Sequence, residues 1–256
     1  MNSTTRYLLI LLLLSCFSFE TFSQEKASEK FAKGVVFFNA GSYKEALQVW
    51  NDVYATGYSS AGLVYNIGNA YFKLNNIPEA ILFYERAYLL NPIDEDINYN
   101  LQIARSLIVD RFQEIPDLFF IKWYNFVSLL LSSYSWAKIS IASFILCLLF
   151  LSLYIYSSKY RQKVIGFWLA LILLVIAISS FALMGRNKFL VHDSHKAIIT
   201  NPVVSGKSSP DNSGKDLFVL HEGTKVSIED EVGEWVEIRL SDGNVGWITV
   251  NSLNII

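Results

Sequence analysis

Two uncharged apolar runs near the middle of the chain constrain its fold more than any other feature. Residues 139–156 and 164–184 contain no charged side chain. At a rise of about 1.5 Å per residue, helices of these lengths match the ~30 Å hydrocarbon core of a bilayer. The weaker alternative is two core helices of a soluble domain, because both uncharged apolar runs are longer than those of an ordinary core helix. The sequence therefore predicts a transmembrane hairpin, with helices at 139–157 and 164–184 joined by a loop at 158–163.

Residues 1–23 have the organisation of an export signal. Arg6 provides a positive charge, an apolar run follows at 7–14, and small residues predict cleavage after Ser23. A second interpretation treats the Leu-Leu-Ser-Cys stretch that ends at Cys16 as a weak lipobox, which would leave that cysteine lipidated. Both interpretations predict that the segment after the signal is exported.

An exported N-terminal region followed by two spans predicts that both soluble regions lie on the outer side of the membrane. The loop at 158–163 would then lie in the cytoplasm. Lys159, Arg161 and Lys163 agree with this orientation, because cytoplasmic loops are enriched in basic residues.

Residues 24–112 contain an internal repeat at an offset of 34 residues. Pairs of residues at this offset share size or chemistry: Gly34 with Gly68, Phe37 with Tyr71, Ala46 with Ala80, and Trp50 with Tyr84. Helical apolar spacing on both sides of a short break predicts two helices in each unit, with units at 27–60 and 61–94. A further helix at 95–112 has no second helix after it and is expected to cap the stack.

The unit at 61–94 closely resembles the tetratricopeptide repeat (TPR). The residues that carry the resemblance are Val64, Ile67, Gly68, Tyr71, Ala80, Tyr84, Ala87 and Pro92. In such a repeat, small residues lie where the two helices touch and aromatic residues fill the space between repeats. The unit at 27–60 keeps fewer of these residues and is a degenerate copy.

The resemblance implies a concave face built from the first helix of each unit. One aromatic residue per unit falls on this face at the repeat spacing, namely Phe31, Tyr65 and Tyr99, and the neighbouring positions are Val35, Phe38, Asn69, Phe72 and Lys73. We expect these side chains to bind an extended peptide or a helix of a partner protein. The alternative is that the rings pack against one another or against the segment before the first span.

Residues 113–138 precede the first span and are rich in aromatic side chains. Their apolar run is too short and too polar to cross a bilayer. Trp123, Tyr124, Tyr134 and Trp136 suit a membrane interface, where aromatic rings are enriched. We expect a helix lying on the outer leaflet, and the alternative is a helix docked on the repeat stack.

The hydrophobic pattern changes to a period of two in residues 185–256. Short β-rich runs occur at 196–200, 217–220, 224–229, 235–240 and 245–249, with an Asp-Gly turn before the last of them. A loop rich in Ser, Gly and Pro is expected at 205–215. Five short strands in so few residues predict a small all-β barrel.

The order of residues in 220–248 resembles a bacterial SH3 domain, and Gly246, Trp247 and Ile248 form its most specific part. The resemblance implies binding of cell-wall peptides or of other proteins. Trp235 and Trp247 are the candidate contact residues, and the alternative is that one or both belong to the core.

The sequence offers little material for catalysis or for a cofactor. Cys16 and Cys147 both lie in apolar runs, which leaves the soluble regions without a disulfide framework or a cysteine nucleophile. His192 and His195 are spaced like metal ligands but lack an evident third ligand, so we expect a solvated linker and no metal site. A net charge of −2 without a basic stripe argues against nucleic-acid binding. We expect a protein that is not an enzyme and has no cofactor.

As a whole, the sequence predicts a multidomain membrane protein with all-α TPR helical repeats, a two-helix transmembrane hairpin and a C-terminal all-β SH3-like barrel. This order of segments resembles the BatE-type aerotolerance proteins of the Bacteroidetes. The resemblance implies a scaffold in the bacterial inner membrane whose two domains face the periplasm, acting in aerotolerance or envelope stress. It also implies von Willebrand A-type Bat membrane proteins as partners. The alternative is a cell-wall sensor whose SH3-like domain binds peptidoglycan, while an enzyme such as an amidase would need a nucleophile and a base.

Overall fold

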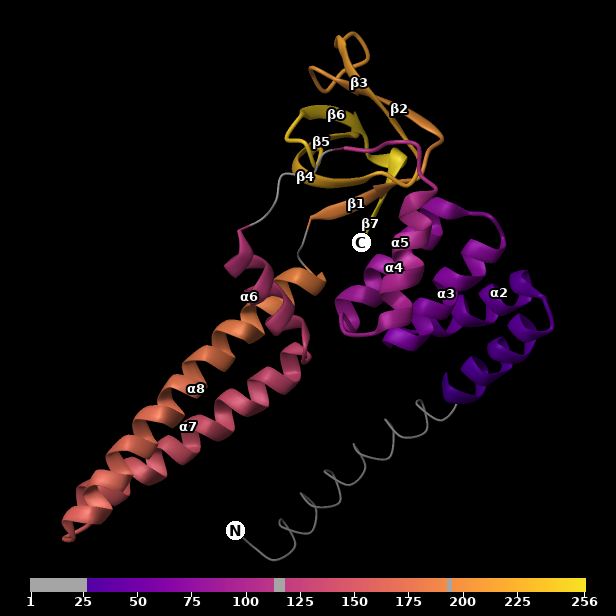
Figure 1. Cartoon of the computed structure of the whole chain (residues 1–256). Coiled ribbons are helices and arrows are strands. Elements are labelled where there is room, and N and C mark those ends of the chain that lie inside the picture. Colours follow the sequence, from indigo (N-terminus) through magenta and orange to yellow (C-terminus); the bar gives the residue numbers. More distant parts are fainter. Residues whose placement is uncertain (1–26, 113–117, 193–194) are drawn as a thin grey trace, which may run out of the picture.

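The computed structural model describes residues 27–112, 118–192 and 195–256 (Figure 1). The predicted export signal and the alternative lipobox lie outside the described residues. The described chain folds into a stack of helices, a hairpin of two long helices and an antiparallel sheet. The predicted fold class, helical repeats followed by two apolar helices and an all-β domain, is confirmed.

The repeat stack consists of a helix at 27–39 followed by α2 (Tyr43–Tyr54), α3 (Ala61–Lys73), α4 (Ile77–Leu90) and α5 (Glu95–Ser106). Side chains of the residues before α3, α4 and α5 accept hydrogen bonds from backbone N–H groups of the first turn, which fixes where these helices begin. The sequence predicted that the last helix continues to residue 112, and this is wrong. Residues 107–112 leave the helix, and Ile108, Asp110 and Phe112 of this segment contact the β domain.

The repeat spacing has a steric cause at two glycines. A Cβ atom on Gly68 would lie 2.7 Å from Cδ1 of Tyr84, and one on Gly34 would lie 2.2 Å from Nε1 of Trp50. Trp50 and Tyr84 are fully buried, so neither ring has room to move away. Each unit therefore pairs a glycine on its first helix with a large aromatic residue on its second.

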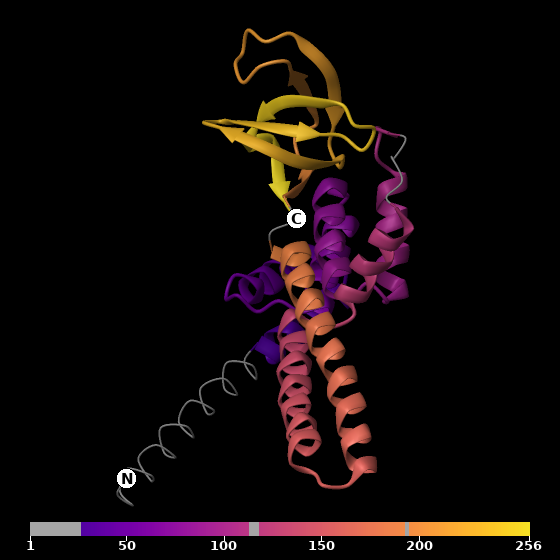
Figure 2. The ribbon, with the colours of Figure 1, turned by 90° about the vertical axis from the view of Figure 1, so that its left-hand side faces the viewer.

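The hairpin consists of α7 (Ser133–Tyr156) and α8 (Tyr160–His192), which project away from the other parts of the molecule in both views (Figures 1 and 2). Both helices are long and apolar enough to cross a membrane. They are longer than the predicted spans, because α7 begins before residue 139 and α8 continues past residue 184.

Small residues dominate the buried positions of the hairpin. These positions are Ser143 and Cys147 on α7, and Gly166, Ala170, Ala177, Ser180, Asn187 and Leu190 on α8. The hydroxyl of Ser140 donates a hydrogen bond to the carbonyl of Ala177 at 2.9 Å, which joins the two helices directly. Small side chains let two helices approach closely, and the large apolar side chains then point outward, as they do in lipid.

The short helix α6 (Phe119–Leu129) packs against the C-terminal part of α8. The hydroxyl of Tyr124 donates to the carbonyl of Ala182 at 3.0 Å. The buried side chain of Asn187 donates to two carbonyls at the end of α6. From the sequence we expected this segment to lie on lipid or on the repeat stack. Its contact with α8 was not predicted.

The β domain contains seven described strands: β1 (Lys196–Ile199), β2 (Val203–Lys207), β3 (Asp216–His221), β4 (Lys225–Val232), β5 (Trp235–Arg239), β6 (Val245–Thr249) and β7 (Leu253–Ile255). They pair antiparallel in the order β3-β2-β6-β5-β4-β1-β7. Strands β2 and β7 were not predicted.

The start of the predicted loop at 205–215 belongs instead to β2. Residues 205–207 pair with β3, and Lys207 also pairs with β6. The physical reason is Gly206, which lies under the ring of Phe218, because a Cβ atom there would be 2.1 Å from Cε2 of that ring. A glycine that signals a loop in the sequence is here the residue that lets an aromatic ring cross the strand.

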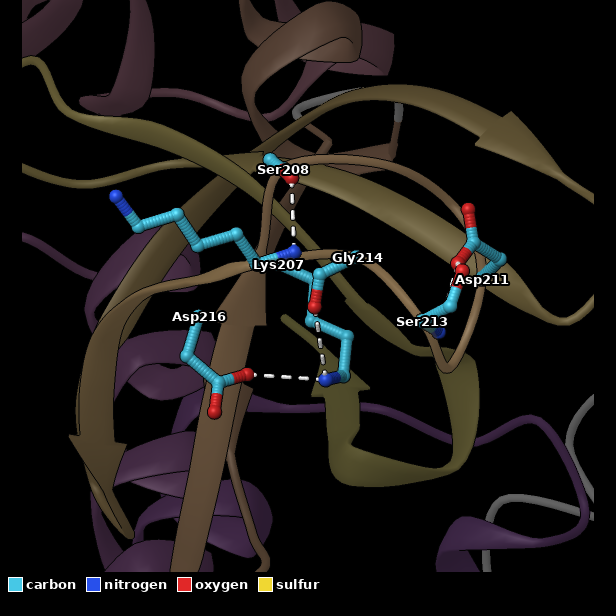
Figure 3. A network of polar contacts seen from close by, with 7 residues as sticks. Lys207, Ser208, Asp211, Ser213, Gly214 and Asp216 are labelled. Carbon is cyan, nitrogen blue, oxygen red and sulfur yellow. Dashed lines mark hydrogen bonds and ion pairs between the residues drawn. The ribbon is translucent and has the colours of Figure 1, made fainter.

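The connection between β2 and β3 is a loop closed by its own polar side chains (Figure 3). The ammonium of Lys207 donates to the carboxylate of Asp216 at 3.0 Å and to the carbonyl of Gly214 at 3.3 Å. Ser213 donates its hydroxyl and its backbone N–H to Asp211, and these hydrogen bonds lower the pKa of the Asp211 carboxyl. The loop therefore keeps a defined shape without contributing to the core.

Candidate functional site

A cavity of about 270 Å³ lies on the face formed by the first helices of the repeat units. Its lining residues are Phe38, Asn69, Phe72, Lys73, Tyr84, Asn100 and Ile103. All of them except Tyr84 belong to the helix at 27–39, to α3 or to α5. We call this cavity the repeat groove.

Hydrogen bonds connect the polar side chains of the repeat groove. The hydroxyl of Tyr84 donates to Oδ1 of Asn69 at 2.8 Å, and the amide of Asn100 donates to the same oxygen at 3.1 Å. The Asn100 amide also donates to the hydroxyl of Tyr65 at 2.7 Å. Burial raises the pKa of both tyrosines, so their hydroxyls keep their protons near neutral pH. The groove thus has a polar floor whose amide and hydroxyl groups hold one another in place.

The structure brings together half of the residues that the sequence assigned to the binding face. Phe38, Asn69, Phe72 and Lys73 line the repeat groove, whereas Phe31, Val35, Tyr65 and Tyr99 do not.

The predicted aromatic row is divided between packing and exposure. The ring of Phe31 packs against Trp50 with centroids 6.2 Å apart, and the ring of Tyr65 packs against Tyr84 with centroids 5.8 Å apart. Tyr99 is 65% exposed. The row therefore does not form one continuous surface, because the first two rings fill space against the second helix of their own unit.

Sequence reasoning missed three groove residues, Tyr84, Asn100 and Ile103. One of them had a detectable signal, since Ile103 lies 34 residues after Asn69. Applying the repeat offset to Asn69, as was done for Tyr65, would have placed Ile103 on the concave face.

Trp235 and Trp247 lie on the outer face of the β domain. Their strands are adjacent, with Trp235 opposite Thr249 and Trp247 opposite Glu237. The residues that alternate with them point into the core, so both tryptophans are half-buried on the other side of the sheet. The two indole rings are available for contact with a ligand.

The β domain docks on helix α4 of the repeat stack (Figures 1 and 2). Glu85 on α4 is only 2% exposed. Its carboxylate accepts a hydrogen bond from Lys225 on β4 at 2.7 Å and forms a second ion pair with Arg105 on α5. Burial by itself raises the pKa of Glu85, but the two cations outweigh burial and hold the pKa at about 2. Glu85 is therefore ionised and joins the two domains.

The segment after α5 makes a second polar contact with the β domain. Oδ2 of Asp110 accepts from the backbone N–H of His221 at 2.6 Å and from the hydroxyl of Thr224 at 2.7 Å. Oδ1 of Asp110 lies 2.8 Å from Nδ1 of the same histidine. Partial burial opposes ionisation of Asp110, but these hydrogen bonds lower its pKa overall.

Apolar contacts complete the docking interface. Ile198 on β1 is fully buried within the core of the repeat stack, and Phe112 packs against the core of the β domain. Gly223 lies directly against Ile108, because a Cβ atom there would be 2.5 Å from Cγ2 of that side chain. The two domains are thus joined by shared packing as well as by charge.

The docking interface and the repeat groove use different residues of the stack. On α4 the β domain contacts Glu85 and also Glu79 and Arg86, which bond to Asn254 and to the backbone carbonyl of Ile255. None of these residues lines the repeat groove. Docking therefore leaves the groove uncovered by the β domain.

The two histidines suggested by the sequence lie on either side of residues 193–194, between α8 and β1. His192 ends α8, and His195 is exposed before β1. Within residues 27–112, 118–192 and 195–256, no group of three or more His, Cys, Asp or Glu side chains is arranged to hold a metal ion.

Comparison with known proteins assigns types to both domains. A family model of the tetratricopeptide repeat matches residues 64–94, and a model of the bacterial SH3 domain matches residues 207–254. No curated protein is significantly similar to the chain. Both matches are to domain types that typically bind other molecules without catalysis, and they support binding of proteins or of the cell wall.

Proposed function

We propose that this protein is a membrane-anchored scaffold that holds a segment of a partner protein in the repeat groove. One observation carries the proposal: the β domain covers one face of α4, while the groove on α3 and α5 stays uncovered. A partner in the groove does not compete with the docked domain. The scaffold can therefore hold its own two domains and a partner at the same time.

The chemistry of the repeat groove describes the segment that it would bind. Phe38, Phe72 and Ile103 provide apolar surface, Asn69 provides an amide on the floor, and Lys73 adds an exposed positive charge. An extended segment or a helix with apolar side chains and a neighbouring carboxylate complements this set.

Three observations support insertion of α7 and α8 in a membrane with both domains on the periplasmic side. The outward-facing side chains of the hairpin are apolar over the length of a bilayer. Contact between Glu85 and Lys225 requires the chain to return to the side from which it entered, as it does after two spans. The predicted export signal and the basic loop at 158–163 favour the periplasm as that side.

The resemblance to BatE-type proteins supplies a cellular setting for this scaffold. The segment order of those proteins matches the order of domains and apolar helices here. We propose a role in aerotolerance or envelope stress, with membrane-bound von Willebrand A-type proteins as partners.

Site-specific crosslinking tests the groove. A photo-crosslinking amino acid at Phe72 in the full-length protein, in native membranes, is expected to give a discrete adduct with one partner. The matched control is Val36, which is 67% exposed on the helix at 27–39 and lies outside the groove lining. Adding Asn69→Leu is expected to reduce the adduct formed at position 72. Equal adducts at both positions, or an adduct at position 36 alone, would contradict the proposal.

A second candidate function is binding of peptidoglycan by the β domain. The half-buried placement of Trp235 and Trp247 on the outward face of neighbouring strands favours it, since indole rings suit sugar or peptide contacts. Full-length protein in detergent is expected to sediment with purified sacculi, and Trp247→Ala is expected to weaken sedimentation. Trp123→Ala on α6 is the control. Sedimentation that is equal for both variants would leave the protein-binding scaffold as the better account.

A further inference from the structure

A cavity of about 670 Å³ lies where the three parts of the molecule meet. Its walls come from α4 and α5 of the repeat stack, from α6 and the end of α8, and from β1, β4 and β5. This volume falls within the range of about 300 to 1,000 Å³ that small-molecule sites occupy. We call it the junction cavity.

The side chains of the junction cavity carry a net positive charge. Of the described side chains that line it, five are cationic and one is acidic: Arg105, Lys122, Lys196, Lys225 and Arg239 against Glu85. Glu85 is shared by two of the cations, and Arg239 pairs with Glu229 outside the lining at 2.8 Å. The cations of the lining therefore outnumber its carboxylate side chain. Ammonium and guanidinium groups bind phosphate through charge-assisted hydrogen bonds.

The junction cavity lies level with the end of the predicted second span. The hydroxyl of Tyr124 on α6 bonds to the carbonyl of Ala182, close to the last residues of the span at 164–184. Phe119 and Trp123 on α6 are 83% and 65% exposed, as suits aromatic side chains at a membrane interface. Lys122 of the same helix lines the cavity, which would therefore lie at the height of lipid headgroups once the hairpin spans a bilayer.

We propose that the junction cavity binds the phosphate-bearing headgroup of an anionic phospholipid from the leaflet that surrounds the outer ends of α7 and α8. Basic pockets beside membrane helices recognise such headgroups by charge. The inference rests on the proposed membrane insertion of the hairpin and does not depend on the repeat groove. A bound headgroup would contact α6, the repeat stack and the β domain together, and would stabilise their arrangement at the membrane.

Native mass spectrometry of the full-length protein released from nanodiscs tests the proposal. The nanodiscs contain phosphatidylcholine with a minor fraction of phosphatidylglycerol. We expect preferential retention of phosphatidylglycerol, and a reduction of about fivefold in Lys122→Gln, the effect of removing one cation near a headgroup. Lys122→Arg keeps the charge and is expected to keep the lipid. Lys188→Gln is the matched control, because Lys188 is exposed on α8 and lies outside the lining.

Equal retention of both lipids, or equal loss in Lys122→Gln and Lys188→Gln, would overturn the proposal.

Competition distinguishes a lipid from a soluble anion. If inorganic phosphate displaces the lipid as readily as glycerophosphoglycerol does, the ligand is free phosphate and the lipid assignment is wrong. Failure of the chain to enter nanodiscs would overturn both this inference and the membrane anchor. An unchanged crosslink at Phe72 in Lys122→Gln would show that the groove is independent of the cavity.

Discussion

Nζ of Lys225 lies 2.7 Å from Oε2 of Glu85, which joins a strand of the β domain to a helix of the repeat stack across 140 residues of sequence. The carboxylate is buried and also faces Arg105. A buried carboxylate is unfavourable without paired charge, so the ion pair makes docking conditional on the correct partner surface. The ion pair therefore adds to the apolar packing that holds the two domains together.

Removal of the Lys225 charge is expected to weaken docking. Lys225→Met leaves Glu85 with Arg105 as its cation, and loss of a charged hydrogen bond costs roughly 2 kcal/mol. The distance between spin labels on the two domains should broaden, and the melting temperature should fall. Lys215→Met, at an exposed position in the β2–β3 loop, is the control. An unchanged distance distribution in Lys225→Met would show that packing alone holds the interface.

Acid is expected to destabilise the docked protein through Glu85. The pKa of Glu85 is lowered from 4.5 to about 2 in the folded state, so its contribution is complete above pH 4.5 and is lost as the pH falls toward 2. A depression of this size corresponds to a contribution on the order of 3 kcal/mol at neutral pH. Thermal unfolding measured across this range should show a shallower decline for Glu85→Gln than for the unsubstituted chain. Parallel curves would mean that Glu85 is not the group responsible.

Gly68→Ala is expected to destabilise the repeat stack although alanine favours helices. Its Cβ atom would lie 2.7 Å from the buried ring of Tyr84, and overpacking of this kind costs about 1–3 kcal/mol. Gly62 on the same helix has no atom within 4 Å of the equivalent position, so Gly62→Ala should stabilise the helix by about 0.5–1 kcal/mol. The melting temperatures of the two variants should therefore move in opposite directions. A shared direction would show that the steric argument is wrong.

Asn187→Leu is expected to release α6 from α8. The amide of Asn187 donates to the carbonyls of Ser128 at 3.0 Å and Leu131 at 3.2 Å, and leucine would remove this donor from both carbonyls. Hydrogen exchange in nanodiscs should become faster across α6, while Lys188→Ala should leave it unchanged. Equal protection of α6 in all three proteins would mean that lipid, and not Asn187, holds this helix in place.

Cysteine labelling is expected to place both domains on one side of the membrane. In a Cys147→Ala background, cysteines at Ser59 and Asn212 should react with an impermeant maleimide in spheroplasts, while a cysteine at Ser158 should react only after lysis. Ser59, Asn212 and Ser158 are exposed, so protection reports the membrane and not burial within the protein. Labelling of Ser158 in intact spheroplasts, with protection at the other two sites, would reverse the orientation.

Local pattern predicted the type of most elements, although it missed β2 and β7. The pairing of Gly68 with Tyr84 recurs at the repeat offset because a helix pair needs a small residue opposite a large one. The apolar run at 164–184 predicted a long helix, and alternation in β5 predicted a strand with one buried face. The pattern was misleading at Gly206, where a residue typical of loops makes room for the ring of Phe218 within a sheet.

How the two domains meet and which side chains share a site became visible only in the folded protein. Glu85, Lys225 and Asp110 are ordinary polar residues in sequence, since a charge on an amphipathic element is expected to face water. Periodicity indicates which face of an element is buried within its own domain. It contains no information about contacts with a second domain that follows the hairpin in the sequence. Periodicity was also insufficient at the repeat groove. Tyr65 had the correct spacing, but its hydroxyl bonds to Asn100 and its ring packs against Tyr84. Contacts between distant segments depend on shape and charge that come together only after each domain has folded.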